Sequence, residues 1–161
     1  KEASKDLIFY TDGDGQYDIG ELELLIPLMT DDIDVVNGIK MFRNDPWYRT
    51  LIGNLYNFTV RNLFNIDIFD TDCDFRLIRK KFVSNIDLKS NSGAICVELV
   101  KKLQLNGARF REVSVHHYDR LHGSSQFFKP MNILKTGIEL IKLWFQINSE
   151  STNKRINALS N

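Results

Sequence analysis

The sequence predicts an α/β domain in which helices flank a mostly parallel sheet. Short apolar runs that end in Gly/Asp-rich turns alternate with helix-like segments of about 10 to 20 residues, as strands and crossover helices do. The chain has 161 residues, of which 43% are hydrophobic, so one domain with a real core is expected. Lys and Arg together number 21, as do Asp and Glu. This balance gives no broad positive field, and we therefore expect no nucleic-acid partner.

The N-terminal part of the chain predicts a strand, a loop, a helix and a second strand. Residues 7–10 form a short apolar run that stops at a Gly/Asp cluster, which is typical of a buried strand that feeds a loop at its carboxyl end. Asp18 precedes Glu21 by three residues, ahead of an apolar run, and this spacing indicates a helix start with Asp18 as N-cap. Residues 33–39 predict the second buried strand.

The middle of the chain predicts a long helix over residues 46–64, and Pro46 suits its first turn. The apolar positions of this helix that recur at helical spacing are Trp47, Leu51, Leu55, Phe58 and Leu63. The elements that follow are an acidic loop over residues 67–74, a helix over residues 93–105 and a strand over residues 110–115. The second helix is expected to stop at Asn106-Gly107, which favours a helix C-terminus.

A last helix is predicted over residues 130–147, where Pro130 opens it. Its apolar stripe consists of Met131, Leu134, Ile138, Ile141 and Phe145. Lysines lie around this stripe, and a basic amphipathic helix with aromatic residues can lie in a membrane interface. The alternative, which the usual behaviour of apolar stripes favours, is a helix docked against its own domain. We therefore divide the chain into a domain over residues 1–129, this helix, and a frayed polar tail over residues 148–161.

Membrane-spanning segments and disulfides are not expected. No run of about 18 apolar residues occurs, so no segment is predicted to cross a bilayer. Cys73 and Cys96 are the only cysteines of the chain, and two isolated cysteines fit a reducing compartment. We expect a cytoplasmic protein whose contact with the cytoplasmic membrane face is peripheral. Because the chain starts at Lys1 rather than Met and has no signal-peptide core, it is expected to be a piece of a longer protein.

The segment Asp12-Gly13-Asp14, which follows the first predicted strand, is a candidate cation site. Two carboxylates one residue apart at a strand end can share a hard cation such as Mg²⁺ or Mn²⁺, which keeps its other positions for water and phosphates. Gly13 and Gly15 would let the backbone turn tightly, so that both side chains converge. The alternative is an ordinary Asp-rich turn.

Two further polar clusters are candidates for chemistry. Residues 70–76 hold three carboxylates and one guanidinium, and clustered acids raise one another's pKa, so that one of them can serve as a general base. A solvated acidic loop is the alternative. Residues 116–129 (HHYDRLHGSSQFFK) leave a predicted strand, and their backbone N–H groups, basic side chains and histidines can meet an anion. Alternatively, each histidine is a surface or core-edge residue.

In this order the clusters resemble those of family-2 glycosyltransferases with the GT-A fold. The resemblance is closest to the dolichyl-phosphate mannose synthase-like branch, which comprises polyprenyl-phosphate glycosyltransferases, and it covers about residues 3–145. The segments that carry it are YTDGDGQYD (10–18), RNDPWYRTLIGNLYNFTVRNLF (43–64), DTDCDFRLIRK (70–80) and EVSVHHYDRLHGSSQFF (112–128).

The resemblance implies a role for individual residues. The cation, Mg²⁺ or Mn²⁺, would be bound by Asp12 and Asp14, with Gln16 as a third member. Asp74 would stand at the position of the catalytic base, with Asp72 beside it as a further catalytic candidate. Phosphate groups of the nucleotide or of the acceptor would be held by Arg76, His117, Arg120, Gly123 and Ser125. Further contacts to the acceptor phosphate would come from Arg43, Arg49 and Arg61.

The implied function is an inverting glycosyltransferase of the hexosyltransferase class, which moves a sugar from a nucleotide-diphosphate sugar to a polyprenyl phosphate such as a dolichyl or undecaprenyl phosphate. A GT-A enzyme with a saccharide hydroxyl as acceptor, and a binding or partner module without activity, are the alternatives. The family's nucleotide-base-binding half precedes the Asp-x-Asp motif, and only about ten residues do so here. We therefore expect that this polypeptide alone is inactive and that an uncovered sheet edge favours homo-oligomers.

Overall fold

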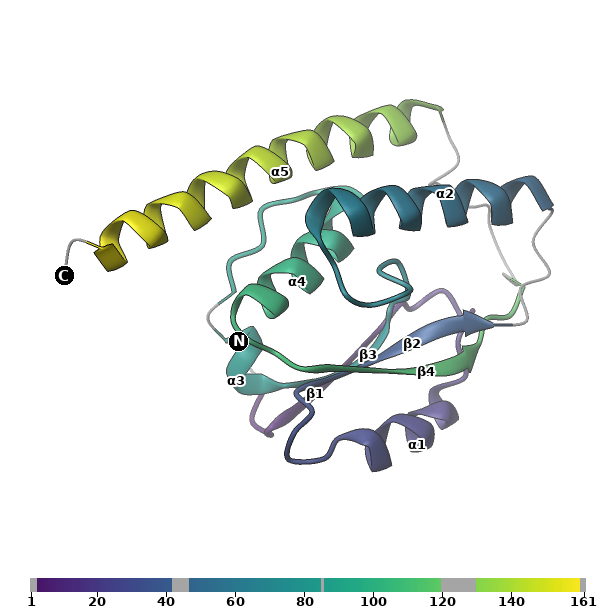
Figure 1. Ribbon diagram of the computed structural model, residues 1–161. Helices are drawn as coiled ribbons and strands as arrows, with labels where there is room; N and C mark the ends of the chain where they lie inside the picture. The colour runs from purple at the N-terminus through teal and green to yellow at the C-terminus, as the bar shows by residue number, and fades with distance from the viewer. Residues whose placement is uncertain (1–2, 42–46, 85, 120–129, 160–161) are drawn as a thin grey trace.

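The computed structural model describes residues 3–41, 47–84, 86–119 and 130–159, which form a four-stranded sheet with helices on both faces (Figure 1). In chain order the elements are β1 (Leu7–Thr11), η1 (Ile19–Glu21), α1 (Leu22–Leu25), η2 (Ile26–Leu28), β2 (Val35–Met41), α2 (Trp47–Phe64), β3 (Phe75–Arg79), α3 (Lys80–Val83), α4 (Ala94–Leu105), β4 (Phe110–His116) and α5 (Pro130–Leu159). The predicted α/β class is confirmed.

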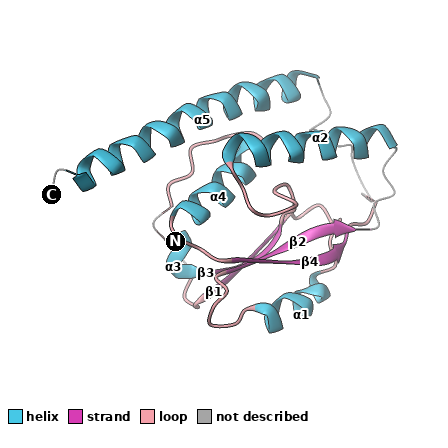
Figure 2. Ribbon diagram, in the orientation of Figure 1, coloured by secondary structure: helices cyan, strands magenta, loops and turns pink. Residues whose placement is uncertain are grey.

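The sheet has the strand order β1-β3-β2-β4 and is mixed (Figure 2). β2 and β4 are parallel, with Val35 opposite Phe110, whereas β3 is antiparallel to both β1 and β2, with Leu7 opposite Arg79. Strands β1, β2 and β4 therefore run in the same direction, as a mostly parallel sheet requires. Because β3 runs the opposite way, two of the three strand pairings are antiparallel. The reason is that β3 lies between β1 and β2 and enters the sheet at the edge where its neighbours end.

One face of the sheet is covered by the short helices η1, α1 and η2 (Figure 1). Leu25 is fully buried there against Val36, Phe75 and Leu77 of the sheet. The predicted N-cap is confirmed, because the Oδ1 atom of Asp18 accepts a hydrogen bond from the backbone N–H of Gly20 at 2.8 Å. The helical segment is short, and Pro27, which disfavours the interior of an α-helix, lies in the 3₁₀ turn η2 that ends it.

The other face is covered by α4, and α2 and α5 pack outside it (Figure 1). Leu103 of α4 is fully buried against Val35 and Ile78 of the sheet. On its other side α4 contributes Val97 and Val100 to a second apolar cluster with residues of α2 and α5. The domain therefore has α1 on one side of the sheet and two layers of helix on the other.

The last helix is longer than expected, because α5 continues past residue 147 to Leu159. Residues 148–159 contain no Gly or Pro to stop a helix, and Gln146 donates a hydrogen bond to Glu150 at 2.9 Å across one helical turn. The helix docks on its own domain through Leu143 and Ile147, which are buried against residues of α2 and α4.

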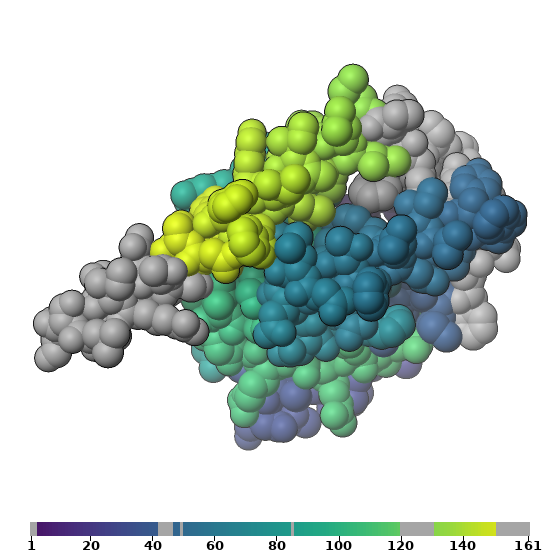
Figure 3. Space-filling view, turned by 45° about the horizontal axis from the view of Figure 1, so that its top comes forward, coloured from purple at the N-terminus to yellow at the C-terminus, as the bar shows by residue number. Residues whose placement is uncertain are grey.

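The predicted apolar stripes of α2 and α5 do not face the core. All five stripe residues of α5 are exposed, and Phe145 keeps 63% of its surface accessible. The five stripe residues of α2 are exposed as well, whereas Val60 and Phe64 of the same helix are buried. Each helix therefore has two apolar faces, of which one packs inward and the other is uncovered. In the space-filling view α2 and α5 lie side by side on one face of the molecule (Figure 3).

Candidate functional site

Four strand ends meet at one edge of the sheet, because β1, β2 and β4 end where the antiparallel strand β3 begins. Residues 12–17 follow β1, residues 70–74 precede β3, and residues 116–118 end and follow β4. We call these three segments together the carboxyl edge. In open α/β sheets, ligands bind outside the carboxyl ends of the strands, so this is the candidate site.

The loop after β1 carries the two carboxylates predicted to bind a cation. Asp12 is exposed, and Asp14 is half-buried, with its Oδ1 atom accepting a hydrogen bond from the backbone N–H of Gln16 at 3.1 Å. Gly15 has a φ of 76°, a left-handed conformation that favours glycine. Gly13 has no positive φ and has open space where a Cβ would lie, so the turn requires a glycine only at Gly15.

Backbone hydrogen bonds join this loop to the other two segments of the carboxyl edge. The N–H of Asp12 donates to the carbonyl oxygen of Asp74 at 3.3 Å. The N–H of Tyr118 donates to the carbonyl oxygen of Gln16 at 2.8 Å, and the side-chain Nε2 of Gln16 donates to the carbonyl oxygen of Tyr118 at 3.0 Å. The structure thus places the Asp-x-Asp loop, the acidic loop and the end of β4 side by side.

The two histidines at the end of β4 have different surroundings. The ring of His117 meets the ring of Tyr17 edge-on with 5.2 Å between the centroids, and its N–H donates to the carbonyl oxygen of Met41 at the end of β2. The carboxylate of Glu21 binds both the N–H and the ring Nδ1 of His116. The Glu21 carboxylate is therefore not used to accept a hydrogen bond from the N–H of the N-cap residue, as a capping box would require. Instead it connects η1 to β4.

The acidic loop is held by its own polar groups. The carboxylate of Asp70 accepts hydrogen bonds from the N–H groups of Lys40 and Asp72, each at 3.2 Å. The carboxylate of Glu112 on β4 accepts from the N–H groups of Phe69 at 2.8 Å and of Asp70 at 3.2 Å. This loop is therefore a fixed part of the fold, rather than the solvated segment that was the alternative interpretation.

Lys40, near the end of β2, supplies a positive charge to the acidic loop. Its Nζ atom donates to the carbonyl oxygen of Asp72 at 2.6 Å and lies 3.3 Å from the carboxylate of the same residue and 3.7 Å from that of Asp70. Burial raises the pKa of Asp72, Asp70 and Asp74 add to this effect, and Lys40 opposes it. Acid clustering therefore contributes to the raised pKa, but burial is the larger cause.

Arg76 on β3 lies beneath the acidic loop, with its side chain fully buried. Its Nε donates to Oδ1 of Asn37 at 2.7 Å and its Nη2 donates to the carbonyl oxygen of Thr71 at 2.6 Å, while its Nη1 lies 3.8 Å from Oδ1 of Asp74. Burial alone would lower the pKa of Arg76, but Cys96 and Asp74 outweigh this effect and raise it. The guanidinium is therefore a permanent positive charge inside the domain.

Asp74 and Cys73 complete the carboxyl edge, and Cys96 of α4 contacts Asp74 from outside it. The thiol of Cys96 on α4 donates to Oδ1 of Asp74 at 3.3 Å, and burial together with Asp74 raises the pKa of this thiol well above its ordinary value. Burial also raises the pKa of Cys73 to about 12, and the Tyr17 hydroxyl lies 3.7 Å from its sulfur. Both cysteines are thus protonated at neutral pH.

Not all residues that the resemblance singles out can be placed at the carboxyl edge. Arg43, Arg120, Gly123 and Ser125, and the side chain of Arg49, lie outside the part of the chain that the structure describes.

Arg61 lies near the carboxyl end of α2, and its guanidinium stacks on the ring of Phe69 at 5.2 Å from the centroid. Within the described ranges it makes no hydrogen bond or ion pair to residues 12–17. A contact of Arg61 with the acceptor phosphate stays a prediction.

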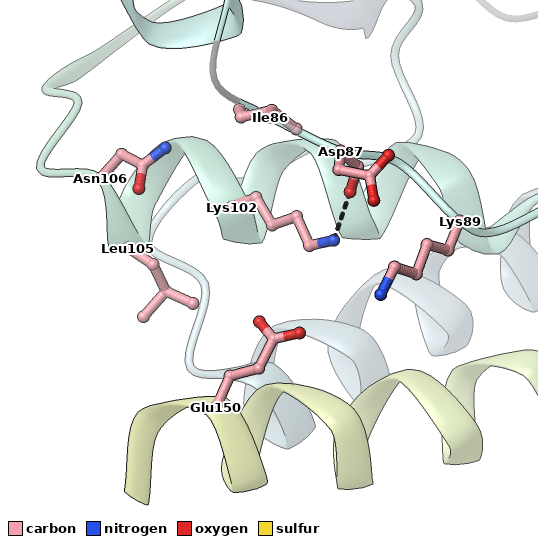
Figure 4. A pocket seen from close by; sticks show the side chains of 7 residues that line it. All are labelled: Ile86, Asp87, Lys89, Lys102, Leu105, Asn106 and Glu150. Atoms are coloured by element: carbon pink, nitrogen blue, oxygen red, sulfur yellow. Dashed lines mark hydrogen bonds between the residues drawn. The ribbon is translucent and has the colours of Figure 1, made fainter. Parts of the chain in front are cut away.

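A cavity of about 230 Å³ lies away from the carboxyl edge, between α4, α5 and the segment before α4 (Figure 4). Its lining carries Lys89 and Lys102 opposite Asp87 and Glu150, so its charges balance, and Lys102 donates to the carbonyl oxygen of Asp87 at 2.6 Å. None of the predicted site residues lines this cavity, and we do not assign the function to it.

The residues predicted to hold a cation provide two carboxylates and an amide, which is the oxygen chemistry that Mg²⁺ and Mn²⁺ prefer. The amide nitrogen of Gln16 is engaged by Tyr118, so its oxygen would be the ligand atom. In the described ranges no three His, Cys, Asp or Glu side chains converge on a metal position. The donor set of Asp12, Asp14 and Gln16 therefore fits such a cation in its chemistry, and its role stays a prediction.

Sequence reasoning missed two residues that contact the carboxyl edge. Lys40 is the one charged residue of β2, whose other residues are apolar or uncharged. A lone charge in such a strand is the signal that could have drawn attention to it. Cys96 gave no such signal, because the helical stripe on which it lies is apolar throughout and its contact with Asp74 depends on the fold.

Comparisons with known proteins agree with this geometry. The model of the family described as glycosyl transferase family 2 matches residues 1–87, more than half of the chain. A curated relative, the undecaprenyl-phosphate 4-deoxy-4-formamido-L-arabinose transferase of Aeromonas hydrophila subsp. hydrophila, is 25% identical over 125 residues. The matched region makes up 78% of this chain and 37% of that relative, so the chain spans little more than a third of its length. With the family model covering both the Asp-x-Asp loop and the acidic loop, the chain belongs to glycosyl transferase family 2.

Proposed function

We propose that the protein of which this chain is part transfers a sugar from a nucleotide-diphosphate sugar to a polyprenyl phosphate, with inversion at the anomeric carbon. The observation that carries the proposal is the carboxyl edge, where the N–H of Asp12 contacts the carbonyl oxygen of Asp74 and Tyr118 pairs with Gln16. Family membership and the lipid-phosphate acceptor in the name of the Aeromonas relative support it.

Asp12, Asp14 and Gln16 would hold a divalent cation next to the diphosphate of the donor. When bound, Mg²⁺ or Mn²⁺ supplies positive charge that stabilises the leaving nucleoside diphosphate. The chain's own contribution is preorganisation: Gly15 sets the turn, and the Asp14 carboxylate and the Tyr118 carbonyl fix the backbone and side chain of Gln16. His117, which lies beside Tyr17 at the same edge, would donate a hydrogen bond to a phosphate oxygen.

A polyprenyl phosphate needs no strong base to become a nucleophile. The second pKa of a phosphate is about 6, so the attacking oxygen is mostly ionised near neutral pH. In this reaction the enzyme must bind and orient an anion, which the resemblance assigns to Arg120 and the neighbouring Gly123 and Ser125.

A saccharide hydroxyl as acceptor is the second candidate, and one observation favours it. Asp74 carries a carboxylate at the carboxyl edge that is fixed by Arg76 and Cys96. A hydroxyl nucleophile must lose its proton, and Asp74 would take that proton as general base.

The uncovered apolar faces of α2 and α5 support the lipid acceptor. Trp47, with 77% of its surface exposed, lies at the start of α2, the helix that follows β2 along the chain. Leu51 and Leu55 continue this face along the helix, and Phe145 lies on the uncovered face of α5. No helix in the described ranges is long and apolar enough to cross a membrane. We therefore propose that the exposed faces of both helices rest on the cytoplasmic face of the membrane without crossing it. This contact would bring the carboxyl edge close to a lipid-borne acceptor.

The test uses the full-length protein with Mn²⁺, a set of nucleotide sugars, and either undecaprenyl phosphate or free saccharides. We expect transfer to the lipid phosphate, its loss on removal of the cation, and a decrease of roughly 100-fold or more in Asp14→Asn, as for loss of a group that stabilises transition-state charge. Asp32→Asn, which changes a carboxylate outside the carboxyl edge, is the control and should keep full activity. Transfer only to saccharides would favour the second candidate, and full activity of Asp14→Asn would remove the cation from the mechanism.

A further inference from the structure

We propose that Cys96 is a positioning residue, whose thiol fixes one oxygen of Asp74 so that the other oxygen accepts a hydrogen bond from a sugar hydroxyl in the site. This inference rests on the proposed function, because it assumes that a sugar binds at the carboxyl edge.

The contacts of the Asp74 carboxylate are one-sided. The Sγ atom of Cys96 lies 3.3 Å from Oδ1 and donates to it, and the Nη1 atom of Arg76 lies 3.8 Å from the same oxygen. Among the described residues, no hydrogen bond or ion pair reaches Oδ2. The hydrogen bond from Cys96 of α4 thus holds Oδ1 and restricts the rotation of the carboxylate, while the Arg76 guanidinium of β3 attracts the same oxygen electrostatically.

The thiol is a donor here because its surroundings keep it protonated. Cys96 is buried near the amino end of α4, a position where a cysteine would otherwise be favoured as a thiolate. Burial and the Asp74 charge raise its pKa, so the S–H is retained and points its hydrogen at Oδ1. A buried cysteine usually acts as a small apolar residue, and the contact with a carboxylate is what sets Cys96 apart.

The remaining oxygen belongs to a residue that reaches the candidate site. Asp74 is linked through its carbonyl oxygen to the N–H of Asp12, and 15% of its side chain is exposed. An ionised carboxylate only accepts hydrogen bonds, and a sugar hydroxyl is the donor that the proposed reaction brings to this edge. With a phosphate nucleophile the hydroxyl belongs to the donor sugar, and with a saccharide acceptor it is the attacking group.

The first experiment measures the contact itself in the full-length protein, by the infrared S–H stretching band of Cys96. The band is assigned by its loss in Cys96→Ala. We expect it at lower frequency than the band of a thiol without a hydrogen bond, and we expect Asp74→Asn to shift it upward. A Cys96 band at the frequency of a thiol without a hydrogen bond, or one that Asp74→Asn leaves unmoved, would overturn the proposal whatever reaction the protein performs.

The second experiment measures the consequence for transfer, with Cys96→Ala, Cys96→Ser and the control Val97→Ala. Loss of one hydrogen bond predicts a decrease in kcat/KM of roughly threefold to tenfold in Cys96→Ala, and Cys96→Ser, which restores a donor, should regain most of it. Val97→Ala removes apolar volume from the same buried helix and should lower the unfolding midpoint without this decrease. A change confined to the KM of the donor assigns the hydroxyl to the donor sugar, and a change in kcat with a saccharide acceptor assigns it to the acceptor.

Two results separate the inference from the proposed function. Unchanged kcat/KM in Cys96→Ala, or no recovery in Cys96→Ser, would overturn the positioning role while transfer by the unchanged protein stands. Absence of any transfer by the unchanged protein would overturn the proposed function and the role of Cys96 with it.

Discussion

The Nε atom of Arg76 donates a hydrogen bond to Oδ1 of Asn37 at 2.7 Å, and both side chains are fully buried at directly opposed positions of β3 and β2. Asn37 uses its Nδ2 to donate to the carbonyl oxygen of Asp70 at 2.9 Å, and Arg76 donates to that of Thr71. This polar pair therefore connects the middle of the sheet to the acidic loop. The acidic loop is therefore positioned by side chains of the sheet that are fully buried.

Substitution of Arg76 should consequently unfold the domain more easily. Arg76→Met leaves the oxygens of Asn37 and Thr71 buried without their donor, and the loss of two hydrogen bonds from a charged group costs about 3–6 kcal/mol. Urea unfolding monitored by circular dichroism measures the free energy of unfolding. Arg111→Met, which removes an exposed arginine from β4, is the matched control and should change it by less than about 0.5 kcal/mol. A loss below about 1 kcal/mol in Arg76→Met would contradict the proposed link.

Gly38 should be intolerant of a side chain, although its backbone is an ordinary strand. A Cβ at this position would lie 2.8 Å from a methyl group of Val115 and 2.9 Å from the sulfur of Cys73. We expect Gly38→Ala to lower the free energy of unfolding by about 1–3 kcal/mol through overpacking. Gly13→Ala, where the Cβ meets open space, should have a small effect. Equal urea midpoints for the two variants would show that β2 can shift enough to accommodate a methyl group at position 38.

Glu98 should make stability depend on pH in the acid range. Its side chain is fully buried, and although burial raises its pKa, hydrogen bonds from Lys102, Ser90 and Lys89 outweigh this effect and lower it. A lowered folded-state pKa gives stability that is present above the ordinary value of 4.5 and is lost as pH falls through the folded-state pKa.

The variant that tests this dependence is Glu98→Gln. It removes the charge, and we expect it to lose about 2 kcal/mol at pH 7 and to show a flatter fall in stability as the pH drops below 4.5. Urea midpoints at several pH values measure both effects. If Glu98→Gln is as stable as the unchanged protein at pH 7, the charge of the Glu98 carboxylate does not stabilise the fold through its hydrogen bonds with Lys102, Ser90 and Lys89.

The uncovered faces of α2 and α5 should bind lipid. We expect the double variant Leu55→Glu/Phe145→Glu to lose most of its sedimentation with vesicles that contain anionic lipid, because both side chains are exposed and would have to enter the interface. Its unfolding midpoint should stay near that of the unchanged protein. Leu24→Glu/Ile26→Glu, which adds the same two charges at exposed positions on the other face of the sheet, is the control and should leave sedimentation unaltered. Undiminished sedimentation of the double variant would contradict the proposed membrane contact.

Local signals in the sequence predicted most of the elements, but β3 and α3 were not predicted and α5 is longer than expected. The strand before Asp12 and the N-cap at Asp18 follow from the immediate sequence, and both are present. The direction of β3 could not be predicted in this way. The sequence of an apolar strand does not show whether it runs parallel or antiparallel to its neighbours, because this depends on the strands with which it pairs. The same limit explains why Cys96 could not be assigned to Asp74: the two residues are 22 positions apart, and their contact exists only once α4 packs on the sheet.

The apolar stripes show a second limit of sequence patterns. In α5, Leu143 and Ile147 dock on the domain while Ile138 and Phe145 face outward, so the helix is apolar on more than one side. Helical periodicity identifies apolar faces but cannot tell which of two the domain covers. For the same reason the sequence correctly predicted a helix here and wrongly favoured its exposed stripe as the docking face.

The mixed sheet also has a consequence for how the protein is made. Each pairing joins distant parts of the chain, since Leu7 lies opposite Arg79, Val35 opposite Ile78, and Val35 opposite Phe110. None of these pairs can form as a local hairpin, and distant pairings fold slowly because long loops must close first. Arg79, the last residue of β3, follows Thr11, the last residue of β1, by 68 positions, so β1 is made long before its partner. The Asp-x-Asp loop and the acidic loop can therefore come together only after β3 has been made, and the end of β4 joins them later still.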